Sequence, residues 1–236
     1  MGQSLCRLVG LLICCSVCGS NALAETIAII GTGNVGAALG QRFAESGHTV
    51  IYGSRDPGRE SIQRLVAASG SLASATTQRA AAQAADIVVL AVPWDIVETL
   101  TRDLGDLSGR IVIDPTNPRS IAADGLRDYA FDGSNAERIQ NVAPGASVVK
   151  AFSSLGAATM LNPDSAGGPV SIPIAGDDAN AKRIVAELVL DVGFEPVDVG
   201  PLRYAHVIEG LHFLRYNAGE FGKGRINYYL PIDPNG

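Results

Sequence analysis

Three glycines spaced Gly31-x-Gly33-x-x-Gly36 are the residues of this chain whose type and position point most directly to chemistry. Gly31 permits a tight turn, Gly33 has no side chain to hold an anion off the backbone, and Gly36 lets a helix pack closely on the preceding strand. An anion then lies on the free N–H groups and the positive dipole end of that helix. The spacing predicts a site for the pyrophosphate of a dinucleotide.

The elements that this turn requires flank it on both sides. Residues 26–30 are strand formers, and Leu39 and Phe43 are four positions apart in the following segment, as one buried face of a helix requires. A strand, a tight turn and a helix are therefore predicted over residues 26–44.

Strand and helix patterns then alternate along the whole chain, apart from an irregular excursion over residues 117–144. This alternation predicts an α/β fold with a doubly wound, mainly parallel Rossmann sheet and a small C-terminal lobe. Residues 25–152 are expected to form the nucleotide-binding domain, and residues 153–236 a lobe that continues the sheet and ends in a helix. Further strands are expected at 48–53, 71–76, 86–92, 110–114, 147–152, 170–174 and 195–199, and helices at 60–69, 77–85, 95–104, 136–142, 179–190 and 202–221.

Ligands of such sheets bind beyond the carboxyl ends of the strands, and polar residues gather there in this chain. Position alone assigns cofactor contacts to Val92, Pro93 and Asn117, while Trp94 fits a core position equally well. The residues that follow the five relevant strands are Thr32 and Asn34, Ser54 and Arg55, Pro93 and Trp94, Thr116 and Asn117, and Ser153.

The end of the second strand distinguishes the two nicotinamide cofactors. An NAD enzyme places Asp or Glu there to accept from the ribose hydroxyls, whereas this chain has Gly53-Ser54-Arg55 followed by Arg59. A hydroxyl and two guanidinium groups suit a 2′-phosphate, because Arg binds oxyanions with paired hydrogen bonds. NADP is therefore the expected cofactor. In the alternative, Ser54 only starts a turn, the arginines are solvated, and Asp56 substitutes for the missing acid.

The net charge and the N-terminal segment limit the partners and the cellular location that we expect. The net charge of −6 provides no electrostatic footprint for nucleic acid or an anionic membrane, so we expect neither as a partner. Residues 1–24 have one charged side chain, an apolar core and a small-x-small end at Ala22-Leu23-Ala24, which is typical of a secretory signal peptide. The apolar run is short for a bilayer span, so no stable membrane span is expected after its removal, although a retained anchor stays open.

The leader implies a periplasmic or secreted protein, or a cytoplasmic one if the true start lies downstream. The expected mature domain contains no cysteine, and therefore no disulfide, thiolate metal site or thiol nucleophile. All cysteines lie in the leader, at Cys6, Cys14, Cys15 and Cys18.

Several motifs together resemble the F420H2:NADP+ oxidoreductases, also called NADPH-dependent F420 reductases. The N-terminal domain is also similar to that of pyrroline-5-carboxylate reductases and of STEAP ferric reductases, and Lys150-Ala151-Phe152 is closer to the latter. The motifs are the glycine turn at 31–36, Gly47-His48, Gly53-Ser54-Arg55, Val92-Pro93-Trp94, Gly176-Asp177-Asp178 and Gly200-Pro201-Leu202.

This resemblance implies an NADP-binding Rossmann domain and a lobe that holds a deazaflavin against the nicotinamide. Two features depart from the family: Ser153-Ser154 stands where its members carry a His-Thr pair, and they lack a leader. The residues implied as NADP contacts are Thr32, Gly33, Asn34, Val35, Ser54, Arg55, Arg59, Val92 and Ile96.

Hydride transfer between stacked rings needs no protein acid or base, since the cofactors carry the chemistry, and we assign no catalytic residue. His206, Glu209 and His212 lie three apart on one helix face. These residues could protonate an acceptor or bind a metal, but ordinary hydrogen-bonded helix positions are the favoured interpretation. No metal site is assigned. His48 is expected to be structural. Lys150, at a strand end, fits substrate contact less well than strand capping.

The leading hypothesis is an NADP(H)-dependent oxidoreductase that exchanges hydride with a small-molecule acceptor, coenzyme F420 or a flavin. Two alternatives stay open. One is a module that binds NADP without turnover, as a structural element or redox sensor; the other is an imine reductase of the pyrroline-carboxylate type, which needs a proton donor. A homodimer is a further open expectation.

Overall fold

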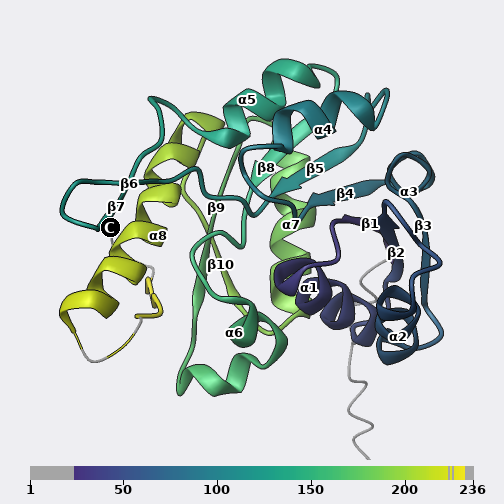
Figure 1. Ribbon diagram of the computed structural model, residues 1–236, viewed down its shortest axis with the longest axis horizontal. Coiled ribbons are helices and arrows are strands. Elements are labelled where there is room, and N and C mark those ends of the chain that lie inside the picture. The colour runs from purple at the N-terminus through teal and green to yellow at the C-terminus, as the bar shows by residue number, and fades with distance from the viewer. Residues whose placement is uncertain (1–23, 223, 225, 232–236) are drawn as a thin grey trace, which may run out of the picture.

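The computed structural model describes residues 24–222, 224 and 226–231, and shows one twisted sheet covered by helices on both faces (Figure 1). The strand order is β10-β9-β8-β5-β4-β1-β2-β3. All neighbouring strands are parallel except β8 and β9. The part of the sheet from β3 to β8 therefore has the doubly wound order, and the strand order reverses between β1 and β4, which creates a ligand crevice there.

The strands of this sheet are short, and the central ones are buried on both faces, as apolar runs such as Ile87–Leu90 require. They are β1 (Thr26–Ile30), β2 (Thr49–Ser54), β3 (Ala73–Thr77), β4 (Ile87–Leu90), β5 (Ile111–Asp114), β8 (Ser147–Lys150), β9 (Ser171–Gly176) and β10 (Glu195–Asp198).

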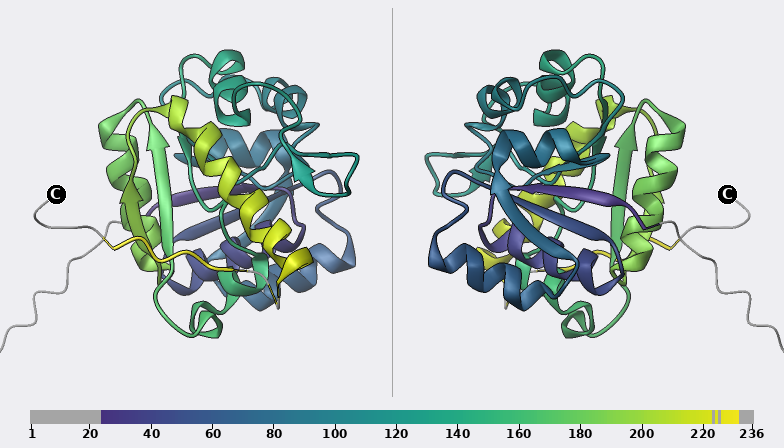
Figure 2. Two further views of the ribbon diagram at one scale, coloured as in Figure 1. Left: turned by 90° about the vertical axis from the view of Figure 1, so that its left-hand side faces the viewer. Right: turned by 90° about the vertical axis from the view of Figure 1, so that its right-hand side faces the viewer.

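Helices connect the strands and form the two outer layers (Figure 2). The last of them, α8, runs obliquely past the β8 and β9 side of the sheet. They are α1 (Asn34–Glu45), α2 (Glu60–Ser69), α3 (Gln78–Ala84), α4 (Val97–Asp103), α5 (Asn135–Val142), α6 (Ala157–Leu161), α7 (Ala179–Asp191) and α8 (Ala205–Phe221), with short 3-10 helices η1 (Pro163–Ala166) and η2 (Leu202–Tyr204).

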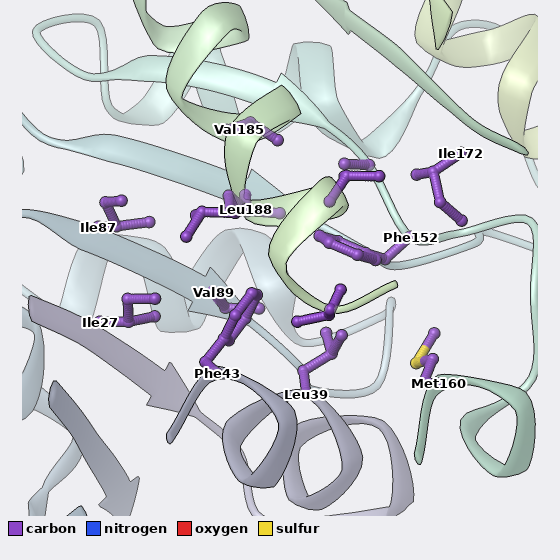
Figure 3. Packing of buried hydrophobic residues seen from close by; sticks show 14 of the residues in the cluster. Ile27, Leu39, Phe43, Ile87, Val89, Phe152, Met160, Ile172, Val185 and Leu188 are labelled. Carbon is purple, nitrogen blue, oxygen red and sulfur yellow. The ribbon is translucent and has the colours of Figure 1, made fainter. Parts of the chain in front are cut away.

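Alternate residues of the central strands β1, β4, β5 and β8 lie in two separate hydrophobic cores. Ile27 and Ile29 of β1 lie in the core under α1, α6 and α7, where Phe43 and Phe152 meet edge to face with ring centroids 6.1 Å apart (Figure 3). Ala28 and Ile30 lie in the opposite core, with residues of α3, α4, α5 and the start of α8. The period of two in the strands thus fixes which helices cover which face.

The expected fold class is confirmed, and most expected elements lie within a few residues of the observed ones. The C-terminal residues add β9 and β10 to the same sheet and contribute α7 and α8, and β9 runs antiparallel to β8. The division into a nucleotide-binding domain and a C-terminal lobe stays a prediction. Two features were not expected: the hairpin of β6 (Ser120–Ile121) and β7 (Arg127–Asp128), and the α6–η1 segment after β8. All of these are too short to show a periodic pattern.

The expected leader lies outside the described residues apart from Ala24. Among the residues that the structure describes, no helix combines the length and apolar character needed to cross a membrane.

Candidate nucleotide-binding site

The glycine turn has the steric demands that its spacing predicts. Gly31 has a φ of 104°, and a Cβ there would lie 2.3 Å from the carbonyl oxygen of Ala91. A Cβ on Gly36 would lie 2.0 Å from the carbonyl oxygen of Gly31, so only glycine lets α1 approach the turn. A Cβ on Gly33 would meet no protein atom within 4 Å. Gly33 therefore leaves open space, which a ligand can use, whereas the other two serve internal packing.

The start of α1 is suited to bind an anion. The helix begins at Asn34 with Gly33 as its N-cap; no side chain caps it, and its first turn has no acidic residue. The first N–H groups of a helix have no partner within the helix, and they carry its positive dipole end. The residues predicted here, Asn34, Val35 and Gly36, supply these N–H groups rather than cleft-lining side chains.

An open cleft of about 960 Å³ lies at the carboxyl ends of β1, β2 and β4. It brings together nine of the thirteen residues predicted to bind the cofactor. Asn34, Val35, Gly36 and Asn117 are not among its lining residues. Those that line it are Gly31, Thr32, Gly33, Ser54, Arg55, Arg59, Val92, Pro93 and Ile96, together with Gly53, Asp56, Gln78, Ala91, Asp95, Thr99, Leu100 and Asp103.

The β2 end of the cleft carries two available positive charges. Arg55 and Arg59 are exposed and line the cleft. Within the described part of the chain neither guanidinium pairs with a carboxylate, unlike Arg64, which pairs with Glu60 on α2. The Ser54 hydroxyl accepts from the Asp56 N–H over 3.2 Å, which fixes the turn between them. This arrangement suits a phosphate, although the Asp56 carboxylate also lines the cleft.

The ends of β5 and β8 meet beside this cleft. The side-chain amide of Asn117 donates to the carbonyl of Ser153 over 2.9 Å, which ties the two strand-end loops together. Phe152 turns the chain there with a φ of 62°, the left-handed backbone conformation that non-glycine residues rarely adopt. Its ring is buried in the core against Phe43. Trp94 is half-buried, with its ring 6.2 Å from that of Phe131.

Comparison with known proteins covers both halves of the chain. Residues 26–118 match the family described as NADP oxidoreductase, coenzyme F420-dependent. The F420-dependent NADP reductase of Methanothermobacter thermautotrophicus is 33% identical over 207 residues, which cover 81% of this chain and 88% of that protein. The chain belongs to the family of F420-dependent NADP reductases. It is thus an oxidoreductase of an NADP-dependent family, as the motifs predicted.

A solved structure supports the same family assignment. The crystal structure of a candidate F420-dependent NADP reductase from Arthrobacter sp. FB24 superposes with a TM-score of 0.79 at 28% identity, covering 89% of this chain and 100% of that one. The two proteins therefore share their fold over most of this chain.

Two other groups resemble the chain in part. Metalloreductase STEAP3 of Rattus norvegicus is 31% identical over 188 residues, but this chain spans only 36% of its length. An imine reductase from Pseudomonas sp. has a TM-score of 0.60 at 17% identity, which shows a shared fold alone. The similarity to the STEAP group that the sequence indicated thus extends over 80% of this chain. For the pyrroline-carboxylate group it is a similarity of fold, since the pyrroline carboxylate reductase of Plasmodium falciparum has a TM-score of 0.52 at 14% identity.

The polar residues of α8, which the sequence singled out, each bind a different neighbouring segment. His206 Nδ1 lies 2.7 Å from the carbonyl oxygen of Gly133, and His212 Nε2 lies 3.0 Å from an Arg127 nitrogen. Glu209 accepts from Lys150. This agrees with the hydrogen-bonded alternative, and no group of metal-ligating side chains is found among the described residues. His48 is buried and lies 3.1 Å from Asp191, a structural position as expected.

The feature that sequence reasoning missed is the role of Lys150. It neither faces the solvent nor caps the strand; it is fully buried and ion-paired with Asp114 and Glu209. One available signal was that β5 and β8 both end in a charged residue, Asp114 and Lys150, directly after an apolar run. Charged residues are rarely buried unless paired, so two such ends on adjacent parallel strands indicate an ion pair.

Proposed function

We propose that this chain is an NADPH-dependent reductase that transfers hydride to a deazaflavin acceptor of the F420 type. Two observations together carry the proposal. Arg55 and Arg59 line the β2 end of the cleft and form no ion pair with a carboxylate of the described residues, and the chain matches an F420-dependent NADP reductase over 88% of that reductase's length. That match includes the acceptor half of the chain, which a nucleotide-binding domain alone does not need.

The cleft residues fit NADPH in chemistry and shape. Gly33 leaves room for the pyrophosphate against the backbone, and the N–H groups that begin α1 bind its charge. Arg55, Arg59 and Ser54 bind the 2′-phosphate, while Val92, Pro93 and Ile96 supply an apolar wall. NADPH, when bound, supplies the hydride. The side chains of this protein bind and orient it, which accounts for most of what such an enzyme contributes.

The acceptor reaches the nicotinamide from the β5 and β8 side of the crevice. There the Asn117 amide fixes the loop after β8, and Trp94 and Phe131 provide aromatic surface beside the strand ends. Flat aromatic surface excludes water from a ring-on-ring contact, as direct hydride transfer requires. Reduction of a deazaflavin consumes one proton with the hydride, and bulk water supplies it in this proposal.

The experiment measures NADPH oxidation by the purified full-length chain. Loss of nicotinamide absorbance is followed with F420, FMN, FAD or a ferric chelate as the acceptor, with NADH in parallel for each. Direct binding of NADPH and NADH is measured in the same preparation by fluorescence titration. We expect turnover with F420 and tighter binding of NADPH than of NADH.

Each other outcome changes the assignment. Turnover with FMN, FAD or the ferric chelate alone overturns the deazaflavin proposal and favours a flavin-dependent reductase related to the STEAP domain. Tight NADPH binding without turnover of any acceptor favours a module that binds NADP without catalysis. Equal affinity for NADH and NADPH overturns the role of the two arginines.

A further inference from the structure

A buried polar network lies directly behind the carboxyl ends of β5 and β8. The Lys150 ammonium donates to Asp114 Oδ2 over 2.9 Å, to Glu209 Oε1 over 2.7 Å, and to the Thr116 carbonyl. The side chains of Lys150, Asp114 and Glu209 are all 0% exposed. One cation thus faces two carboxylates in a site that water does not reach, where charges interact strongly.

The network continues into the loops that border the cleft. Asp114 Oδ1 accepts from the N–H and hydroxyl of Thr116, over 2.8 and 2.6 Å. Thr116 Oγ1 accepts from the Asn135 side chain over 2.8 Å, and the same amide donates to the Trp94 carbonyl over 3.1 Å. A continuous chain of hydrogen bonds therefore joins α8 to the loops after β4 and β5.

These two loops carry predicted cofactor contacts. Trp94 follows Pro93, which lines the cleft, and Thr116 precedes Asn117, which binds the loop after β8. A shift of the network would therefore move both sides of the crevice at its nicotinamide end. The rate of hydride transfer is sensitive to displacements of about 1 Å in the reacting geometry. Residues that hold these two loops in place are therefore expected to affect that rate.

Glu209 is the asymmetric member of the network. Its Oε1 accepts from Lys150 and from the Asn135 N–H over 3.1 Å, whereas its buried Oε2 has no hydrogen-bond partner among the described residues. A proton can therefore bind Oε2 without breaking any existing hydrogen bond. Without it, the network of one ammonium and two carboxylates has a net charge of −1; with it, the network is neutral.

The surroundings of Glu209 bring its protonation equilibrium close to neutral pH. Burial is the main cause that raises its pKa to about 7; Lys150 opposes the rise and Asp114 adds to it. From the loop after β7, Tyr129 also faces this carboxylate. On α8 itself His212 lies one turn away, and burial together with Arg127, Arg119, Lys150 and Arg215 lowers its pKa to about 3, so it stays neutral.

We propose that Lys150 and Glu209 are positioning residues that hold the nicotinamide end of the cleft, and that the proton on Glu209 tunes the relative affinity for NADPH and NADP+. This inference rests on the proposed function of the cleft. The oxidised nicotinamide ring carries a positive charge and the reduced ring does not. An ionised Glu209 therefore favours NADP+, and a protonated Glu209 favours NADPH. Between two unit charges that do not touch, at the effective dielectric constant of a protein, such an effect is on the order of threefold to tenfold.

The first readout is Trp94 fluorescence in the ligand-free protein, followed as a function of pH. Trp94 is the only tryptophan in the sequence, and its carbonyl is bound by the Asn135 side chain of the network. We expect a transition near pH 7 in the wild type and its absence in Glu209→Gln, which keeps the shape of the protonated acid. Glu220→Gln, at an exposed glutamate on the same helix, is the matched control and keeps the transition.

Two histidine variants separate the carboxylate from the imidazoles. His206→Gln and His212→Gln are each expected to retain the transition near pH 7. A transition that survives in Glu209→Gln, or that disappears in either histidine variant, assigns the response elsewhere and overturns the proposal. A wild-type signal that stays flat across neutral pH also overturns it.

The second readout is the affinity for NADPH and for NADP+ in fluorescence titrations one pH unit below and above neutrality. The ratio of the two dissociation constants is expected to shift toward NADP+ at the higher pH in the wild type and in Glu220→Gln, and to stay constant in Glu209→Gln. An equal shift in Glu209→Gln overturns the proposal. Failure of the wild type to bind either nucleotide overturns the proposed function instead, and the Trp94 transition tests the network independently of it.

Discussion

The Lys150 ammonium and the Glu209 carboxylate lie 2.7 Å apart, although 59 positions separate them in the chain and neither is exposed. The pair fixes α8 to the end of β8, next to the loops that border the cleft. Burial disfavours the Lys150 charge, but Asp114 and Glu209 outweigh that effect and raise the pKa of the ammonium. The cation is therefore the fixed charge of the network, and Glu209 is the member that changes its protonation state near neutral pH.

Removal of the Lys150 charge should destabilise the fold strongly. In Lys150→Met, the buried carboxylates of Asp114 and Glu209 lose the ammonium group that both share, and breaking a buried pair in this way costs about 3–5 kcal/mol. Urea denaturation followed by circular dichroism measures the free energy of unfolding. Lys182→Met is the control, because the Asp198 side chain of that pair is largely exposed and such pairs contribute about 0–1 kcal/mol. Equal losses in the two variants contradict the buried network.

The pH dependence of stability should separate Glu209 from His212. The pKa of Glu209 is raised from 4.5 to about 7, so the folded state binds more protons in that interval and the free energy of unfolding falls as the pH rises through it. The pKa of His212 is lowered from 6.5 to about 3, so the unfolded state binds more protons there and stability rises with pH. Between pH 4.5 and 6.5 the two effects oppose each other.

Single variants should therefore show opposite dependences of the free energy of unfolding on pH. Glu209→Gln leaves the His212 effect and should gain stability as the pH rises from about 3 to 6.5, whereas His212→Gln should lose stability from 4.5 to about 7. Each slope approaches about 1.4 kcal/mol per pH unit in mid-interval. Denaturation midpoints measured across this range test the signs; parallel curves for the wild type and both variants would falsify the assignment.

The sequence predicts the nucleotide-binding half well because its constraints are local. Gly31, Gly33 and Gly36 specify backbone geometry within a single turn, and the apolar run of β4 specifies a strand covered on both faces. Ser54 and Arg55 directly predict positive charge, rather than a carboxylate, at the end of β2. Each of these inferences needs only neighbouring residues, and the structure places most of them around one cleft.

The contacts of α8 and of the β6–β7 hairpin are harder to predict because they join residues that are distant in the sequence. Glu209 has the spacing of a helix-face residue, and nothing local shows that its partner lies on β8. The β6–β7 hairpin has two residues in each strand, and Arg127 fixes it through a hydrogen bond to Asn217, 90 positions away. Pattern reasoning identifies elements with a period, whereas these contacts depend on tertiary packing.

The two arginines at the β2 end should determine nucleotide preference. Arg55→Ala combined with Arg59→Ala removes the two guanidinium groups that we propose bind the 2′-phosphate, and NADPH affinity should fall about 10- to 100-fold. NADH lacks this phosphate, so its affinity should stay nearly constant. Fluorescence titration with both nucleotides measures the change. Arg64→Ala is the matched control, because Arg64 is exposed, pairs with Glu60 and does not line the cleft. A loss of equal size for NADH and NADPH would contradict the phosphate assignment.

Alanine substitutions in the glycine turn should affect NADPH binding and folding separately. Alanine at Gly33 meets no protein atom, and its φ of −76° is accessible to any residue, so Gly33→Ala should change the free energy of unfolding by no more than about 0.5 kcal/mol. Its methyl group enters the space assigned to the pyrophosphate and should weaken NADPH binding at least about tenfold, the loss expected when ligand and backbone can no longer approach closely.

Gly36→Ala should show the opposite pattern, with folding as the primary defect. Its Cβ would lie 2.0 Å from the Gly31 carbonyl oxygen, a backbone atom that cannot move without displacing the turn. We expect a loss of at least about 2 kcal/mol in the free energy of unfolding, as for other overpacked sites. Urea denaturation and NADPH titration of both variants, carried out side by side, measure the two effects. If Gly33→Ala unfolds more readily than Gly36→Ala, then Gly33 serves internal packing. If Gly33→Ala binds NADPH as the wild type does, then the pyrophosphate lies elsewhere.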